Sequence, residues 1–213
     1  MPKNIKSTAW WLICISSLTV SLYPLYYLVA EQPVGILMHK ASELLASTQW
    51  NVAFYSHICL GGLALGIGWI QFSKSIRQEY PIVHVVIGSV YAVAVLISGL
   101  GSIYLAQLAD GGIISEIGFT ILGTLWLATT GASYYHITQG KVAQHQAMMT
   151  YSYALCLAAV TLRIFLPLLI ILFDDFITAY RIVAWLCWIP NLGVAYLIQT
   201  RSIALKSTPV TAS

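Results

Sequence analysis

Residues 145–163 decide the fold; they read HQAMMTYSYALCLAAVTLR, from His145 to Arg163. The stretch is a predicted membrane helix, and counting from His145 by fours and threes reaches five more positions on one helical face: Met149, Ser152, Cys156, Ala159 and Arg163. This face is about 27 Å long, close to the thickness of the hydrocarbon core. An arginine inside a membrane helix is costly unless it faces the bundle interior or a cavity. We therefore predict that Arg163 is functional.

The composition is that of an integral membrane protein. Hydrophobic residues make up 59% of the 213 residues and charged residues only 8%, against roughly 25% charged residues in a soluble domain. The net charge of +3 is small and scattered, and nothing indicates a nucleic-acid surface. Apolar spans use up almost the whole chain, so we expect any chemistry to take place in or at the lipid bilayer.

Six apolar stretches are each long enough to cross a bilayer. We predict an all-α bundle of six transmembrane helices, a single polytopic domain over residues 1–213, with spans at about 8–30, 50–72, 81–105, 116–137, 146–172 and 177–200. The first stretch also resembles a signal peptide, but its length, Pro24 and the lack of a clear cleavage motif favour a retained helix. Residues 34–46 predict a short amphipathic helix on the membrane surface, with His39 as a surface residue.

The basic residues predict the orientation. Cytoplasmic termini leave seven of the ten basic residues inside: Lys3, Lys6, Lys74, Arg77, Lys141, Arg201 and Lys206. Lys40 and Arg181 are then outside, and Arg163 lies within the bilayer. Because cytoplasmic loops carry an excess of Lys and Arg, we predict that both termini are cytoplasmic.

Small residues line one face of the second predicted span. His57, Gly61, Ala64, Gly68 and Gln71 share this face, and Gly62 and Gly66 form a small-x-x-x-small pair beside it. Small residues allow another helix or a flat ligand to approach closely. Helix packing explains the glycines, but it does not explain His57.

Three histidines from different helices fall near the predicted cytoplasmic face: His84, His136 and His145. Imidazole is the usual axial ligand of haem iron, and two imidazoles at one depth suit haem b. We predict His84 and His145 as the haem iron ligands, with His136 in reserve. The alternative is that a histidine at a helix end meets interfacial water and binds no cofactor. A catalytic zinc site is a further alternative, and the weaker one, because Glu79 is the only acidic residue near this face.

His57 and Arg163 fall at a similar depth in the outer half, and no acidic residue lies in the interior of a predicted span. In one interpretation the two side chains face a common polar pocket. There Arg163 donates to a quinone-like oxygen or an anionic group, and His57 exchanges a proton. In the alternative interpretation, the Arg163 side chain extends outward to a surface carboxylate: Asp110, Glu116, Asp174 or Asp175.

Several of these residues form an order along the chain that resembles a known family. The order consists of His57 and Gly61, Gln71-Phe72, Arg77, His84, Gly88, Tyr91, Gly111-Gly112, Gly118-Phe119, Trp126, His145, Thr161-Leu162-Arg163 and Pro167. Over residues 50–170 it resembles domain-of-unknown-function family 2306, bacterial membrane proteins without an established activity. The resemblance implies a bacterial inner-membrane location. The family's architecture is distantly similar to that of multi-helix cytochrome b-type membrane proteins.

The chain departs from the family pattern at basic positions. Val85 stands where an arginine usually follows the histidine, and Gln146, Ala147 and Met148 replace a basic pair and a tryptophan. These losses weaken the expectation of contacts to haem propionates or anionic lipid but leave the histidines in place. The sequence therefore predicts a membrane redox protein that binds haem b near its cytoplasmic side and a quinone-like substrate near His57 and Arg163. The alternative is a cofactor-free transporter or assembly subunit.

Overall fold

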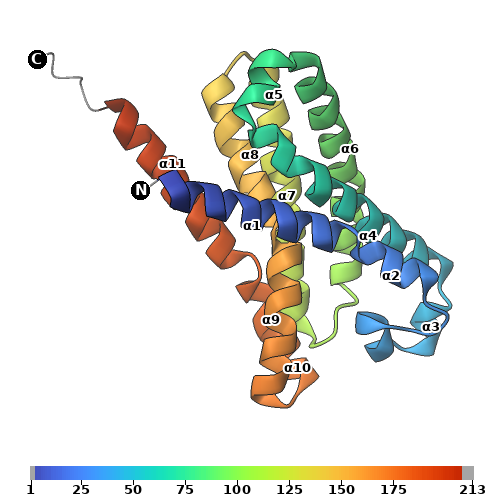
Figure 1. Cartoon of the computed structure of the whole chain (residues 1–213). Helices are drawn as coiled ribbons and strands as arrows, with labels where there is room; N and C mark the ends of the chain where they lie inside the picture. The colour runs from blue at the N-terminus through green and yellow to red at the C-terminus, as the bar shows by residue number, and fades with distance from the viewer. Residues whose placement is uncertain (1–2, 208–213) are drawn as a thin grey trace, which may run out of the picture.

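The computed structural model describes residues 3–207, and within them the chain is helical without a strand. The α-helices are α1 (Lys3–Ser21), α2 (Tyr23–Val29), α3 (Ser42–Leu45), α4 (Thr48–Gly68), α5 (Lys74–Glu79), α6 (Pro81–Ala106), α7 (Ile113–Thr138), α8 (Val142–Cys156), α9 (Ala158–Phe173), α10 (Phe176–Leu186) and α11 (Ile189–Ser207). Two 3₁₀ helices complete the order, η1 (Gly35–His39) and η2 (Trp69–Phe72). Figure 1 shows α4, α6, α7 and α8 packed as a bundle, which α1 and α2 cross on one side.

Six helical segments are long and apolar enough to cross a membrane, which confirms the predicted fold class. They are Trp10–Val29, Thr48–Phe72, Pro81–Ala106, Ile113–Thr138, Val142–Phe173 and Phe176–Arg201. The cytoplasmic placement of the termini stays a prediction, and the side chains of Lys3, Lys6 and Lys206 on which it partly rests lie outside the described residues. We therefore name the two ends of the bundle after their residues, the Arg163 end and the His145 end.

Local sequence signals set several helix ends. Pro81 stands at the start of α6, where its missing N–H is not needed. The Ser47 and Ser73 hydroxyls accept from the backbone N–H groups of Trp50 and Ile76 at the starts of α4 and α5. At the start of α10 the Asp175 carboxylate accepts from Thr178 N at 2.7 Å. This hydrogen bonding to Thr178 lowers the pKa of Asp175, because it stabilises the charged carboxylate.

Glycines of α4 allow its neighbours to pack closely, as the sequence predicts. A Cβ on Gly62 would lie 3.0 Å from the Ser21 carbonyl oxygen, and one on Gly66 would lie 3.0 Å from Ser21 Cβ, so this pair seats the end of α1. A Cβ on Gly61 would lie 3.0 Å from Ser98 Oγ on α6. The glycine faces therefore serve helix packing on two sides of α4.

The fifth and sixth spans are each interrupted, which corrects the prediction of continuous helices. Leu157 separates α8 from α9, and Cys187 and Trp188 separate α10 from α11. The Asn191 amide joins the two breaks, because its Nδ2 donates to the carbonyl oxygens of Ala154 (3.2 Å) and Cys187 (3.0 Å). A side chain that inserts between helix carbonyls is a known cause of such a break. The continuous polar face expected from His145 to Arg163 is therefore divided at Leu157.

The connection between α2 and α4 folds over the Arg163 end. Instead of one surface helix over residues 34–46, the structure has η1 and α3, with Lys40 and Ala41 extended between them. Lys40 Nζ lies 3.0 Å from Asp110 Oδ2 and donates to Leu108 O at 2.6 Å. His39 is exposed, as predicted, and its ring stacks on Phe176 at 3.7 Å. This connection thus links the α6–α7 loop to the start of α10.

Candidate functional site

The His57 ring is fixed by Ser98 on the neighbouring helix α6. Its Nδ1 lies 3.0 Å from the Ser98 carbonyl oxygen, and the Ser98 hydroxyl donates to the His57 carbonyl oxygen at 2.9 Å. A carbonyl oxygen only accepts, so the proton of the neutral ring is on Nδ1 and the lone pair is on Nε2. The structure therefore holds His57 in one orientation with Nε2 able to accept a proton.

Arg163 lies beside two tyrosines at the same end of the bundle. Its guanidinium carbon is 4.4 Å from the centre of the Tyr23 ring, and Nη1 donates to the Ala159 carbonyl oxygen at 2.9 Å. Tyr27 follows one turn later in α2, with its ring 5.4 Å from that of Tyr23. A cation over an aromatic face is favourable, most of all away from water.

Not every donor of the Arg163 guanidinium group is hydrogen-bonded. Arg163 Nε is buried and has no hydrogen-bond partner within the described part of the chain. The ion pair found among the described residues joins Lys40 to Asp110, not Arg163 to a carboxylate. The interpretation in which the Arg163 side chain reaches out to a surface carboxylate is therefore wrong. Nη1 instead bonds one turn back along α9, toward the bilayer centre.

His57 and Arg163 fall at a similar distance from the same end of the bundle, and their sharing of one pocket stays a prediction. His57 lies about 14 Å along α4 from Thr48, and Arg163 about 15 Å from the end of α9 at Phe173. We call His57, Arg163, Tyr23 and Tyr27 the Arg163 site. The two tyrosines were not predicted, although their i, i+4 spacing places them on one helix face.

His145 at the opposite end is fixed in the same way as His57. Its Nδ1 lies 2.8 Å from Ser133 Oγ and 3.1 Å from the Ser133 carbonyl oxygen, and the Ser133 hydroxyl donates to His145 O at 3.2 Å. The proton is again on Nδ1, which leaves Nε2 available. A histidine that ligates iron or zinc is anchored through its second nitrogen in this manner.

His84 is held differently. In the orientation of the Gln71 amide that satisfies both its ends, the NH₂ donates to His84 Nδ1 and to the His84 carbonyl oxygen at 3.2 Å, and the oxygen accepts from Gly88 N at 3.0 Å. Since Nδ1 is an acceptor here, the proton of the neutral ring is on Nε2. His84 lies within electrostatic range of His145.

Only one of the two predicted haem ligands, His145, has a lone pair on Nε2 that could bind the iron. His145 presents a free Nε2, but Nε2 of His84 carries the proton, and iron needs a lone pair there. If the Gln71 amide were turned over, its oxygen could accept from a proton on His84 Nδ1, and Nε2 would then have a lone pair. In that orientation, however, the amide oxygen would also face the His84 carbonyl oxygen, and the NH₂ would face Gly88 N. The haem therefore stays a prediction.

His136, in the last turn of α7, is the third histidine predicted near this end. Its Nδ1 is buried without a hydrogen-bond partner in the described part of the chain. No group of three or more His, Cys, Asp or Glu side chains that could hold a metal ion occurs among the described residues. The three histidines are thus not assembled as the zinc alternative requires.

Between the two fixed histidines, hydroxyl groups fill the centre of the bundle. Ser152 Oγ lies 2.8 Å from Tyr91 OH and 2.7 Å from Thr130 Oγ1, and Trp126 Nε1 donates to Tyr91 OH at 3.4 Å. These four side chains are at most 6% exposed and satisfy one another. They connect α6, α7 and α8, as interhelical hydrogen bonds do in membranes. The sequence placed Ser152 on the interior face but did not reveal its partners.

Comparison with known proteins agrees with a membrane location. A family model described as predicted membrane protein (DUF2306) matches residues 54–199. The chain belongs to this family. No curated protein matches the chain, and no solved structure matches it. The DUF2306 match extends beyond the 50–170 stretch of the resemblance into α11, and it contains His57, Arg163, His84, His136 and His145. The two tyrosines of the Arg163 site lie before the matched region.

Proposed function

We propose that this multi-pass membrane protein is a redox protein of the bacterial cytoplasmic membrane that binds a quinone-type head group at the Arg163 site. The observation that carries the proposal is the buried Arg163 Nε, which has no hydrogen-bond partner among the described residues. A buried donor of a charged group is costly when it is unpaired. A carbonyl oxygen of a membrane-soluble ligand would accept from it and remove that cost.

The surrounding side chains suit such a ligand. A quinone is a flat ring with two carbonyl oxygens, and the Tyr23 and Tyr27 rings offer apolar walls beside the guanidinium. His57 Nε2 can exchange a proton with a ligand oxygen while Ser98 keeps Nδ1 protonated. The proposal assigns Arg163 to binding and His57 to proton exchange.

Binding of a short-chain benzoquinone and a short-chain naphthoquinone to the protein in nanodiscs tests the proposal. Arg163→Lys keeps the charge but loses the planar fork, so we expect affinity to fall about tenfold or more. Arg181→Lys is the matched control, because Arg181 is exposed and donates to Gly111 O outside the site. Equal affinities in all three proteins, or no binding to wild type, would leave a cofactor-free transporter or assembly subunit as the better account.

Haem b near the His145 end is a second candidate, favoured by the anchored His145 ring. It requires Gln71 to release His84 Nδ1. We expect a b-type reduced-minus-oxidised spectrum in protein purified from haem-replete cells, and its loss in His145→Ala. A colourless protein without bound iron would exclude this candidate and leave the Arg163 site untouched.

A further inference from the structure

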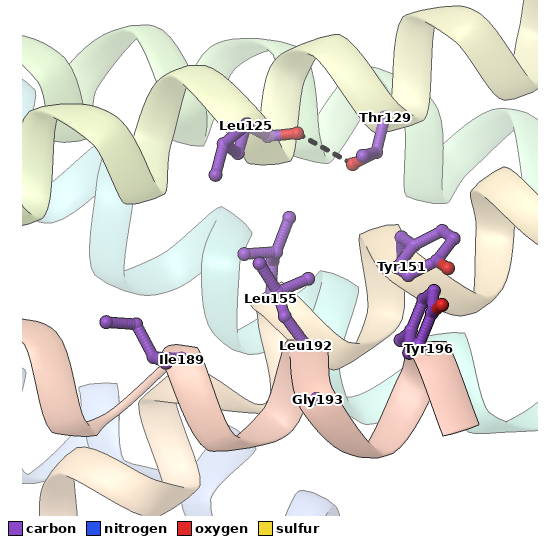
Figure 2. Close-up of a pocket in the computed structure, with 8 residues that line it drawn as sticks. All are labelled: Leu125, Thr129, Tyr151, Leu155, Ile189, Leu192, Gly193 and Tyr196. Atoms are coloured by element: carbon purple, nitrogen blue, oxygen red, sulfur yellow. Dashed lines mark hydrogen bonds between the residues drawn. The ribbon is translucent and has the colours of Figure 1, made fainter. Parts of the chain in front are cut away.

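A groove opens between α7, α8 and α11, away from the Arg163 site (Figure 2). It has a volume of about 510 Å³. Its walls are mostly apolar, with Leu125 from α7, Leu155 from α8, and Ile189 and Leu192 from α11. Tyr151 and Tyr196 stand close together toward one end of the groove in Figure 2.

The interrupted helices account for the groove. Asn191 fastens the first turn of α11 to α8 through the Ala154 carbonyl oxygen and to α9 through Thr161 Oγ1 (3.0 Å). Beyond this point α11 runs away from the bundle in Figure 1. Since α11 starts against α8 and then diverges, the space beside α7 is left unfilled by protein.

The groove is small compared with a whole transmembrane helix. A helix with side chains is about 10–12 Å wide and rises about 5.4 Å per turn, so one turn occupies roughly 400–600 Å³. The groove of about 510 Å³ would take about one turn. A single hydrocarbon chain is narrow enough to lie along it.

The tyrosines add a polar end. Neither the Tyr151 nor the Tyr196 hydroxyl is hydrogen-bonded to another described residue, whereas the Thr129 hydroxyl is used by its own helix, at 2.7 Å from Leu125 O (Figure 2). Tyr196 lies five residues before Arg201, the last residue of its span, which is about 7.5 Å along the helix. Ile189, at the other end, is near the middle of that span. The groove thus runs from the bilayer centre toward the interface at the His145 end.

We propose that this groove binds one phospholipid of the leaflet at the His145 end. One acyl chain lies against Leu125, Leu155 and Leu192, and the tyrosine hydroxyls donate to ester or phosphate oxygens of the lipid. Tyrosine suits this position because its ring is apolar and its hydroxyl reaches the interface. The site shares no residue with the Arg163 site, so either can fail without the other.

Two glycines offer a matched test. A Cβ on Gly193, which lines the groove, or on Gly131, which is exposed elsewhere on α7, would meet no atom within 4 Å. A side chain can therefore begin at either position without a clash at Cβ, but only that of Gly193→Leu would extend into the groove. Native mass spectrometry of protein purified in mild detergent, with an added phosphatidylethanolamine as probe, measures lipid retention.

We expect one retained phospholipid in wild type and in Gly131→Leu, and at least a tenfold lower bound fraction in Gly193→Leu. The double variant Tyr151→Phe, Tyr196→Phe should keep the groove but lose lipid on mild activation sooner than wild type. Equal retention in the two leucine variants would overturn the proposal. So would a lipid-free wild-type dimer that Gly193→Leu converts to monomer, because a second copy would then occupy the groove.

Discussion

At the scale of single residues, close contacts at the centre of the bundle leave no room for added atoms. A Cβ on Gly68 would lie 2.6 Å from Tyr153 Cε2 and 2.9 Å from Tyr91 Cε2. Neither ring can move freely, because Tyr153 OH donates to Leu65 O and Tyr91 OH is bonded to Ser152. We expect Gly68→Ala to destabilise the protein by about 1–3 kcal/mol, measured by unfolding in detergent.

Gly131→Ala is the control for this substitution, since it adds the same methyl group where no atom lies within 4 Å. It should leave stability unchanged or raise it slightly, because alanine favours the helix. If both variants unfold alike, the packing of Tyr91 and Tyr153 around Gly68 is not as described.

The same scale shows what single-sequence reasoning can and cannot find. The similar depth of His57 and Arg163 followed from counting residues along helices, and the observed bounds of α4 and α9 leave that count unchanged. The roles of Ser98, Ser133 and Gln71 did not follow. Each depends on which side chain of a neighbouring helix lies opposite, and helix periodicity does not specify this register.

At the scale of helices, the first turn of α10 depends on a charged cap. The pKa of Asp175 is lowered by its hydrogen bonds to Thr178, so its stabilising effect is present above the unfolded-state pKa and is lost as pH falls through the lower, folded-state pKa. We expect wild type to lose more thermal stability than Asp175→Asn between about pH 7 and about pH 3.

Asp174 provides the matched control, because its carboxylate makes no hydrogen bond to a described residue. Its backbone φ of 50° is also one that asparagine accepts. Asp174→Asn should therefore follow the wild-type pH profile. A profile for Asp175→Asn that matches wild type would show that the cap does not contribute.

The breaks at Leu157 and at Cys187–Trp188 are among the features of this scale that the sequence did not predict. Hydropathy determined the length of each span closely, because every helical residue in a bilayer needs apolar surroundings. The breaks depend instead on Asn191 reaching the Ala154 carbonyl oxygen across 37 positions of the chain. Only the packing of α11 on α8 brings these groups together.

At the scale of the whole molecule, the six spans require the loops to alternate between the two sides of the membrane. Lys40 and Asp110, from the first and third connections, and Phe176, directly after the fifth, lie at one end of the bundle, as alternation demands. We expect reporter fusions after Thr48, Lys74, Gly112 and Lys141 to read outside, inside, outside and inside. A cytoplasmic signal after Gly112 would contradict the topology.

The most direct test of the central claim is to find where a quinone binds. Irradiation of the protein in nanodiscs with a photoreactive azido-quinone, followed by peptide mapping, should label the segment with Tyr23 and Tyr27 or the α9 segment around Arg163. An excess of unmodified quinone should prevent the label, and Arg163→Lys should reduce it, while Arg181→Lys should not. Labelling confined to other segments, or equal in wild type and Arg163→Lys, would contradict the account.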